Sequence, residues 1–240
     1  MDPYYMLKLT LKLFSSILLL TIFLGCSKSK EQPPAKADDL FVVTHLTEPG
    51  SFTSGVEGPA VSPDGILYAV NFARQQTIGK VMPSGEASIF VELDGESTGN
   101  GIRFDSNGDM FIADYVNHNI LRVDMETNEI SVFAHNANMN QPNDIAISSK
   151  DIIYASDPDW SNDSGQLWMV DNEGNTTLIE DNMGTTNGIE VSPEDERLYV
   201  NESVQRNIWV YDLSDDGIPE NRRLFYQFED FGMDGMRCDV

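Results

Sequence analysis

The sequence predicts an all-β fold made of repeated units of four short strands. One polar position returns along the chain at intervals of 43 to 47 residues. Each return is followed by a turn and by apolar-rich segments of strand length. Beyond the N-terminal leader, no segment keeps the 3.6-residue apolar period of a helix. Four strands in a unit of about 44 residues are typical of the blades of a β-propeller.

The recurring position marks where each unit begins. Asn100 ("GNGI"), Asn143 ("PNDI") and Asn187 ("TNGI") are separated by 43 and 44 residues. Glu57 stands 43 residues before the first of them, and Asp234 stands 47 residues after the last. An Asn-Gly pair alone would favour a hairpin turn, because both residues tolerate positive φ. Acidic residues at the same phase need no such backbone, so we interpret the position as a repeated functional side chain.

The rest of each unit agrees with a blade. Seven residues after the recurring position comes a turn, which is followed by an apolar strand, "ILYAV", "DMFIAD", "IIYAS" or "RLYVNE". A third strand, a second turn and a fourth strand complete the unit. The "DSNGD" at 105–109 resembles the start of a helix–loop–helix calcium site, but it lacks the later Glu and falls at the first hairpin, so we predict a turn there. The acidic "DPDWSNDSG" at 157–165 is predicted to be a loop after the second strand.

The N-terminal residues are predicted to form a secretion signal. Lys8 and Lys12 precede a twelve-residue apolar run, which is too short to cross a bilayer. The following "FLGC" resembles a bacterial lipobox, which predicts a signal peptide over residues 1–25 and lipid on Cys26; the alternative is an ordinary signal peptide with an incidental Cys. Residues 26–39 are polar and contain two prolines, so they are predicted to be a tether. The expected location is the periplasmic side of a bacterial membrane, held only through the lipid.

Composition limits the possible partners. The formal net charge is −24, and such an acidic surface repels phosphate backbones, so we expect no nucleic-acid partner. Besides Cys26 the chain has only Cys238, which excludes a disulfide within the domain and a Cys/His zinc pattern. The domain over residues 40–240, with blades starting near 57, 100, 143, 187 and 234, is expected to be a monomer. Because it holds about four blades and the start of a fifth, it is expected to expose an unpaired sheet edge and an apolar blade face, and therefore to be poorly stable.

The recurring side chains are expected to converge. In a propeller the innermost strands run side by side around a central channel, so residues at one phase reach the same height on its axis. Carboxylate and amide oxygens without His or Cys suit a hard cation such as Ca²⁺, whose charge two carboxylates would neutralise. The phase therefore predicts a metal site, with Ca²⁺ as the first choice and Zn²⁺, Mn²⁺ or Mg²⁺ as alternatives.

Four segments at blade spacing resemble one known family. The strings "VEGPAVSPDG", "QPNDIAI", "TTNGIEVSPEDERLYVNES" and "MDGMRCDV", between about residues 50 and 240, are similar to the senescence marker protein / gluconolactonase / luciferin-regenerating enzyme-like family. The resemblance implies a six-bladed propeller with one catalytic divalent cation, and six units would extend well past Val240. It also implies that the cation is held by Glu57, Asn143, Asn187 and Asp234.

The resemblance implies roles for further residues. Asn100 is expected to contact the substrate, and so is Gln141, which stands where animal gluconolactonases have an Arg. Asp234 is expected to act as general base or nucleophile in opening a lactone or ester with water. Asp114, Asp157 and Glu202 are expected to lie in the layer behind the ligands, and the last two are the alternative acids. The competing hypothesis is a lipid-anchored binding propeller without catalysis, in which Ca²⁺ is structural.

Overall fold

The computed structural model describes residues 43–239 of the chain. The predicted signal peptide, Cys26 and the tether lie outside these residues, as do the first residues of the predicted propeller range. The described part contains sixteen β-strands and no helix, so the all-β prediction is confirmed. Among the described residues, accordingly, no helix is long and apolar enough to cross a membrane.

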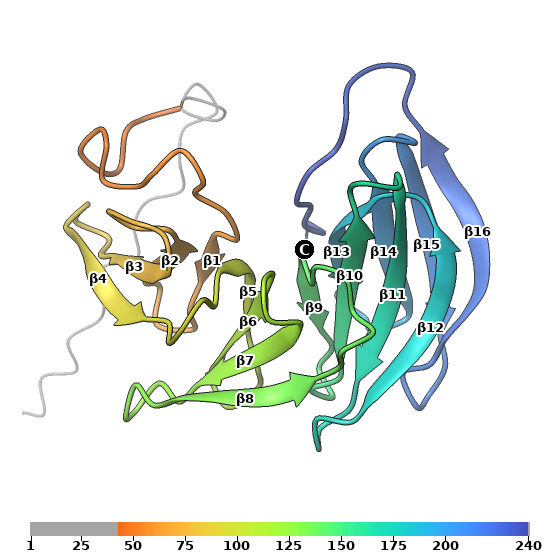
Figure 1. Ribbon diagram of the computed structural model, residues 1–240, viewed down its shortest axis with the longest axis horizontal. Helices are drawn as coiled ribbons and strands as arrows, with labels where there is room; N and C mark the ends of the chain where they lie inside the picture. The colour runs from red at the N-terminus through yellow and green to blue at the C-terminus, as the bar shows by residue number, and fades with distance from the viewer. Residues whose placement is uncertain (1–42, 240) are drawn as a thin grey trace, which may run out of the picture. The chain divides into compact units, whose positions relative to one another are not determined.

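The strands form four antiparallel sheets of four, each built from consecutive strands (Figure 1). The first sheet contains β1 (Ala60–Val61), β2 (Leu67–Val70), β3 (Thr77–Val81) and β4 (Ala87–Glu92). The second contains β5 (Gly99–Phe104), β6 (Met110–Asp114), β7 (Asn119–Val123) and β8 (Ile130–His135). The third contains β9 (Ile145–Ile147), β10 (Ile153–Asp159), β11 (Ser164–Val170) and β12 (Thr176–Met183). The fourth contains β13 (Thr186–Val191), β14 (Arg197–Glu202), β15 (Asn207–Leu213) and β16 (Pro219–Gln227). These sheets are the predicted blades of a β-propeller.

Tight hairpins join the strands because turn residues occur at fixed places in every unit. In the "DSNGD" turn the Asp105 carboxylate accepts hydrogen bonds from the backbone N–H groups of Asn107 and Asp109, at 3.0 and 2.8 Å. Gly108 takes the left-handed conformation there, with φ of 89°. The segment is thus the predicted hairpin turn. The acidic stretch after 157 is also a hairpin, whose connection lies between β10 and β11.

Alternation along each second strand explains how the blades pack. Successive side chains of a strand point to opposite faces of its sheet. In β6, Ile112 therefore packs towards the first blade, while Phe111 and Ala113 pack towards the third. In β10, Ile153 packs towards the second blade and Tyr154 towards the fourth. Each pair of neighbouring blades thus shares one apolar core, and the innermost strands β1, β5, β9 and β13 contact one another in turn.

Side-chain bonds between first turns also connect the blades. The Asp151 carboxylate accepts a hydrogen bond from the Ser106 N–H, at 2.8 Å, and another from the Ser106 hydroxyl, at 2.6 Å. Asp195 accepts the same two bonds from Ser149, with 2.9 Å to the N–H. Both aspartates have a left-handed backbone conformation, with φ of 59° and 56°, at a turn position that is glycine in the other two blades. Their carboxylates compensate for that backbone by bridging to the preceding blade.

Candidate active site

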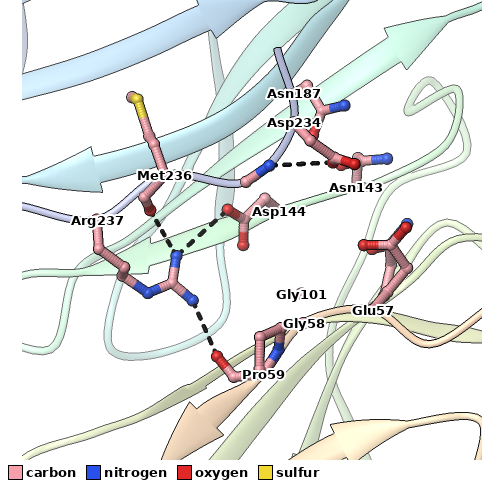
Figure 2. A pocket seen from close by; sticks show the side chains of 12 residues that line it. Glu57, Gly58, Pro59, Gly101, Asn143, Asp144, Asn187, Asp234, Met236 and Arg237 are labelled. Atoms are coloured by element: carbon pink, nitrogen blue, oxygen red, sulfur yellow. Dashed lines mark hydrogen bonds and ion pairs between the residues drawn. The ribbon is translucent and has the colours of Figure 1, made fainter. Parts of the chain in front are cut away.

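The recurring side chains meet at one cavity. The cavity has a volume of about 330 Å³ and lies where the innermost strands come together (Figure 2). The structure thus brings the residues of the repeated phase to one cavity. The five residues of the repeated phase that line it are Glu57, Asn100, Asn143, Asn187 and Asp234.

The elements that carry these residues are the starts of the blades. Asn100 lies in β5 and Asn187 in β13, whereas Asn143 precedes β9 and Glu57 precedes β1. Asp234 lies in the irregular segment that follows β16. Asn187 is in a strand and is not among the residues with positive φ, so the hairpin interpretation of "TNGI" does not apply.

Glycine after the recurring position lets the strands approach the axis. A Cβ on Gly101 would lie 2.5 Å from the Asp144 Oδ1 and 3.1 Å from the Asn143 carbonyl oxygen. A Cβ on Gly188 would lie 2.5 Å from the Asp234 carbonyl oxygen. Real Cβ atoms do not come as close as 2.5 Å, so a side chain at either glycine would displace the segment that carries the polar residue of the next unit, Asn143 or Asp234. The glycines of "GNGI" and "TNGI" are explained by this close approach.

Asn187 has a buried oxygen without a protein partner. Its side chain is 5% exposed, and Nδ2 donates to the Ser203 hydroxyl at 3.1 Å. Within residues 43–239 its Oδ1 accepts no hydrogen bond although it is buried. Leaving such an acceptor unpaired is costly, because burial removes its water partners. A cation in the cavity would satisfy it.

The electrostatics of the cavity also favour a cation. Burial raises the pKa of Glu57, and the negative charges of Asp234 and Asp144 raise it further. A pKa raised in this way means that the site, as it stands, disfavours a second and third negative charge in the same space. A divalent cation would remove that penalty.

The donor set fits a hard cation. No group of three His, Cys, Asp or Glu side chains in the described part of the chain could hold a metal by itself. The cavity instead combines the carboxylates of Glu57 and Asp234 with the amide groups of Asn143 and Asn187. Carboxylate and amide oxygens are the ligands that Ca²⁺ takes in proteins. The residues present therefore fit a calcium ion.

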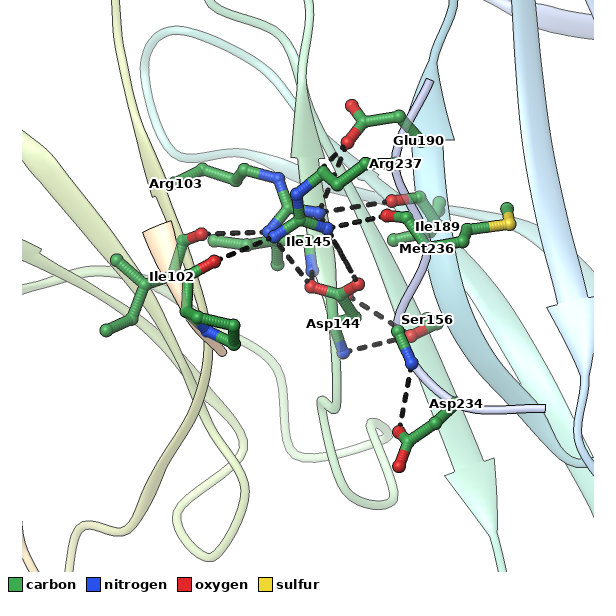
Figure 3. A network of polar contacts seen from close by, with 12 residues as sticks. Ile102, Arg103, Asp144, Ile145, Ser156, Ile189, Glu190, Asp234, Met236 and Arg237 are labelled. Carbon is green, nitrogen blue, oxygen red and sulfur yellow. Dashed lines mark hydrogen bonds and ion pairs between the residues drawn. The ribbon is translucent and has the colours of Figure 1, made fainter. Parts of the chain in front are cut away.

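A largely buried ion network lies beside these cavity residues (Figure 3). Arg103 approaches the Asp144 carboxylate at 3.2 Å and the Glu190 carboxylate at 3.5 Å. Arg237 pairs with the same two carboxylates, both at 3.6 Å, and donates to the Pro59 carbonyl oxygen at 3.4 Å. Burial nevertheless raises the pKa of Glu190, although both arginines act in the opposite direction. The network connects all four blades to the C-terminal segment.

Two side chains near the end of β14 hold that segment. The Asn201 Nδ2 donates to the Asp234 carbonyl oxygen at 2.6 Å, and the Ser203 hydroxyl donates to the Met233 carbonyl oxygen. These contacts keep Asp234 at the cavity although no described strand contains it. Sequence reasoning missed both residues. It also missed the ion network, whose signal was an acid, Asp144, at the position that is glycine in "GNGI" and "TNGI".

The acids predicted behind the ligands serve as anchors for loops. Asp114 and Glu202 end the second strands of their blades, and Asp157 lies near the end of β10; all three are buried and do not line the cavity. Each carboxylate accepts a backbone N–H from the loop that enters its own blade. Burial raises the pKa of Asp157 even though its hydrogen bonds lower it. The amide donors are those of Thr98, Gln141 and Gly184, at 3.1, 2.6 and 2.7 Å.

Asn100 and Gln141, the predicted substrate contacts, have different surroundings. Asn100 lines the cavity, whereas Gln141 is not among its lining residues. Gln141 stands two residues before Asn143, and its backbone N–H donates a hydrogen bond to the Asp157 carboxylate. A contact between the Gln141 side chain and a substrate stays a prediction.

Comparison with known proteins gives a consistent picture. A family model described as the SMP-30/Gluconolactonase/LRE-like region matches residues 56–240. A gluconolactonase of Zymomonas mobilis is 28% identical over 219 residues, which cover 76% of this chain and 61% of that protein. The chain thus spans less than two thirds of the length of this relative.

Solved structures share the fold. A gluconolactonase from Xanthomonas campestris superposes with a TM-score of 0.68 at 19% identity, over 81% of this chain and 69% of that one. A regucalcin from Agrobacterium tumefaciens, described as a calcium-binding protein, gives 0.65 at 19% identity, over 77% of this chain and 64% of that one. At such identities the likeness extends to the fold alone.

Proposed function

The chain belongs to the SMP-30/gluconolactonase/LRE-like family, as the sequence motifs indicated, and from this premise we propose that it is a calcium-dependent hydrolase that opens a lactone ring. One observation carries the proposal. Polar side chains from the starts of four blades and from the C-terminal segment line one cavity. Two carboxylates are among them, together with a buried amide oxygen that has no partner in the described chain.

The proposed ligands are Glu57, Asn143, Asn187 and Asp234. Two carboxylates neutralise the charge of a divalent ion, and two neutral amides complete an oxygen set. The raised pKa of Glu57 and the unpaired Asn187 Oδ1 support this set, because both penalties end when a cation binds. When bound, the cation supplies Lewis-acid polarisation of the substrate carbonyl and stabilises the charge that develops on its oxygen.

Asp234 is the proposed general base. Its side chain is exposed at the cavity wall, and its Oδ1 accepts a hydrogen bond from the Gly235 N–H at 3.0 Å. The bond fixes the carboxylate, while Oδ2 receives no hydrogen bond from residues 43–239. That oxygen can take a proton from the attacking water. Asn100, on the same cavity, would hydrogen-bond the substrate and orient its ring.

The decisive experiment measures acid release from a panel of lactones and esters with a pH indicator. After chelation with EDTA, hydrolysis should be lost, and addition of Ca²⁺ should restore it; Mg²⁺, Mn²⁺ and Zn²⁺ are tested in parallel. Glu57→Gln should lower the affinity for the restoring ion, whereas the exposed Glu86→Gln should not. Activity that survives complete chelation would exclude a metal-dependent reaction. If no lactone or ester is turned over, the protein is a binding propeller.

A further inference from the structure

Ser203 connects two of the residues at the cavity. It follows β14, is 8% exposed, and its backbone N–H donates to the Thr185 carbonyl oxygen at 2.8 Å. Its hydroxyl lies between the Asn187 amide and the Met233 carbonyl oxygen. One small side chain therefore contacts a proposed ligand on one side and, on the other, the residue before Asp234.

The number of protons at this contact fixes the direction of each bond. A serine hydroxyl has one proton to donate, and a carbonyl oxygen can only accept. The Ser203 proton therefore goes to Met233, which leaves Ser203 as an acceptor towards Asn187. An acceptor must meet the NH₂ end of the amide, at 3.1 Å. The opposite end, Oδ1, is then the one without a protein partner.

We propose that Ser203 is a positioning residue that selects which end of the Asn187 amide is offered to the cation. The inference rests on the proposed metal site. An amide turned by 180° would present its NH₂ group, which repels a cation and removes one ligand from the set. Nothing in the size of the two ends prevents that turn, because amide O and N are nearly equal in shape. Hydrogen bonding therefore determines the orientation of the amide. The Met233 carbonyl oxygen accepts the Ser203 proton, and the Ser203 oxygen then accepts a hydrogen bond from the NH₂ group of Asn187.

Calcium titration of the intact protein tests the inference by isothermal calorimetry, which needs no substrate. Ser203→Ala removes the acceptor, and we expect the Kd for Ca²⁺ to rise about tenfold, the effect of one well-placed hydrogen bond. Ser203→Thr keeps the hydroxyl and should restore most of the affinity. Ser148→Ala is the matched control, because Ser148 is also buried and its hydroxyl also accepts N–H groups, in this case those of the Lys150 and Ile152 backbone. It should leave the Kd unchanged.

A symmetric ligand gives the sharper test. In an Asn187→Asp background both ends of the side chain are oxygens, so no selection is needed. There Ser203→Ala should change the Kd less than twofold, although it changes it tenfold beside Asn187. An equal loss in both backgrounds would overturn the proposal, because it would show a general structural effect.

The remaining outcomes are also decisive. If Ser203→Ala binds Ca²⁺ as tightly as the wild type, Ser203 does not orient Asn187. Should that variant fail to fold, Ser203→Cys takes its place, since a thiol keeps the size but is a weak acceptor; an unchanged Kd in it overturns the proposal. A wild type that binds no Ca²⁺ would contradict the proposed function itself.

Discussion

The Asn201 side chain donates a hydrogen bond to the backbone carbonyl oxygen of Asp234, with 2.6 Å between Nδ2 and the oxygen. Asn201 is 2% exposed and belongs to β14, so a rigid strand determines where an irregular segment lies. The closeness of Gly188 to the same carbonyl shows how little space the segment has. The position of the proposed base thus depends on a neighbouring blade.

Removing the hydrogen bond between Asn201 and Asp234 should impair hydrolysis more than it lowers stability. Asn201→Ala should lower the free energy of unfolding by about 1 kcal/mol, the usual value of one hydrogen bond. It should lower kcat/KM for a lactone by up to about 100-fold, because a small displacement of a catalytic group is costly. Asn172→Ala is the control, since it removes a similar 3.0 Å bond to a carbonyl oxygen, that of Lys150, in a turn of the third blade. Equal kinetics in both variants would show that the Asn201 hydrogen bond does not position Asp234.

Replacing the proposed base should separate catalysis from binding. Asp234→Asn keeps one carbonyl oxygen but cannot accept a proton at neutral pH. We expect kcat to fall by about 10²–10⁴-fold, the usual contribution of a general base. Calcium affinity, measured by calorimetry, should fall but stay detectable. Asp230→Asn, which changes an exposed acid four residues earlier, should leave kcat unchanged. Near-full turnover of Asp234→Asn at saturating Ca²⁺ would assign the base to another acid.

The ion network should behave differently from a surface pair. Arg103 is 10% exposed and faces Asp144 and Glu190, so Arg103→Met leaves buried carboxylates without one of their two cations. Breaking such a buried pair costs about 3–5 kcal/mol. Arg223→Met breaks a 2.8 Å pair with Asp212 in which both side chains are 45% exposed, and it should cost less than about 1 kcal/mol. Urea unfolding measures both. Equal losses would mean that the Arg103 network is as hydrated as the surface pair.

The architecture and the recurring residues of the cavity could be predicted because they depend on repetition. A phase of about 44 residues predicted four strands per unit, and one polar residue per phase predicted a shared cavity. Both predictions require only that the same sequence position in each repeat occupies the same place in each blade. Glu57 and Asp234 were found in this way although their residue types differ from those at the other positions.

The places of Arg103 and Glu190 in the ion network could not be predicted, and a β-bulge in each of their strands is the reason. Arg103, Glu190 and Arg237 each stand three residues after the recurring position. In a regular strand, residues three apart point to opposite faces. The register shifts between Gly99 and Ile102, and again between Thr186 and Ile189, so an extra residue changes the face. Hydrogen-bonding partners such as Asn201 and Ser203 were equally hidden, because they depend on contacts between distant segments.

Attachment to a membrane is predicted from residues outside the described structure. The short apolar run and "FLGC" predict lipid on Cys26, which would anchor the protein to a bilayer. The wild type should enter the detergent phase on Triton X-114 extraction, and Cys26→Ser should enter the aqueous phase or keep its leader. Cys238→Ser removes the free thiol of the described chain and should not change the partition. A wild type found in the aqueous phase would contradict the anchor.

The pH dependence of stability should show whether burial or the two neighbouring arginines dominate the pKa of Glu190. Burial raises its pKa in the folded protein above the ordinary value of 4.5, and the favourable charges of Arg103 and Arg237 only partly offset this. A folded-state pKa above the unfolded one means that the folded protein holds the proton more tightly. The stability that Glu190 contributes is therefore fully present below about pH 4.5 and is lost as the pH rises through the raised pKa.

Glu190→Gln removes this titration while keeping the shape of the side chain. The free energy of unfolding of the wild type minus that of the variant should therefore fall as the pH rises above about 4.5, and become constant once Glu190 is charged in the folded protein. Urea unfolding across that range measures the difference. Glu194→Gln, an exposed acid in the next turn, should give a smaller change with pH. A difference that rises with pH would mean that the two arginines outweigh burial, and that the charged form of Glu190 stabilises the network.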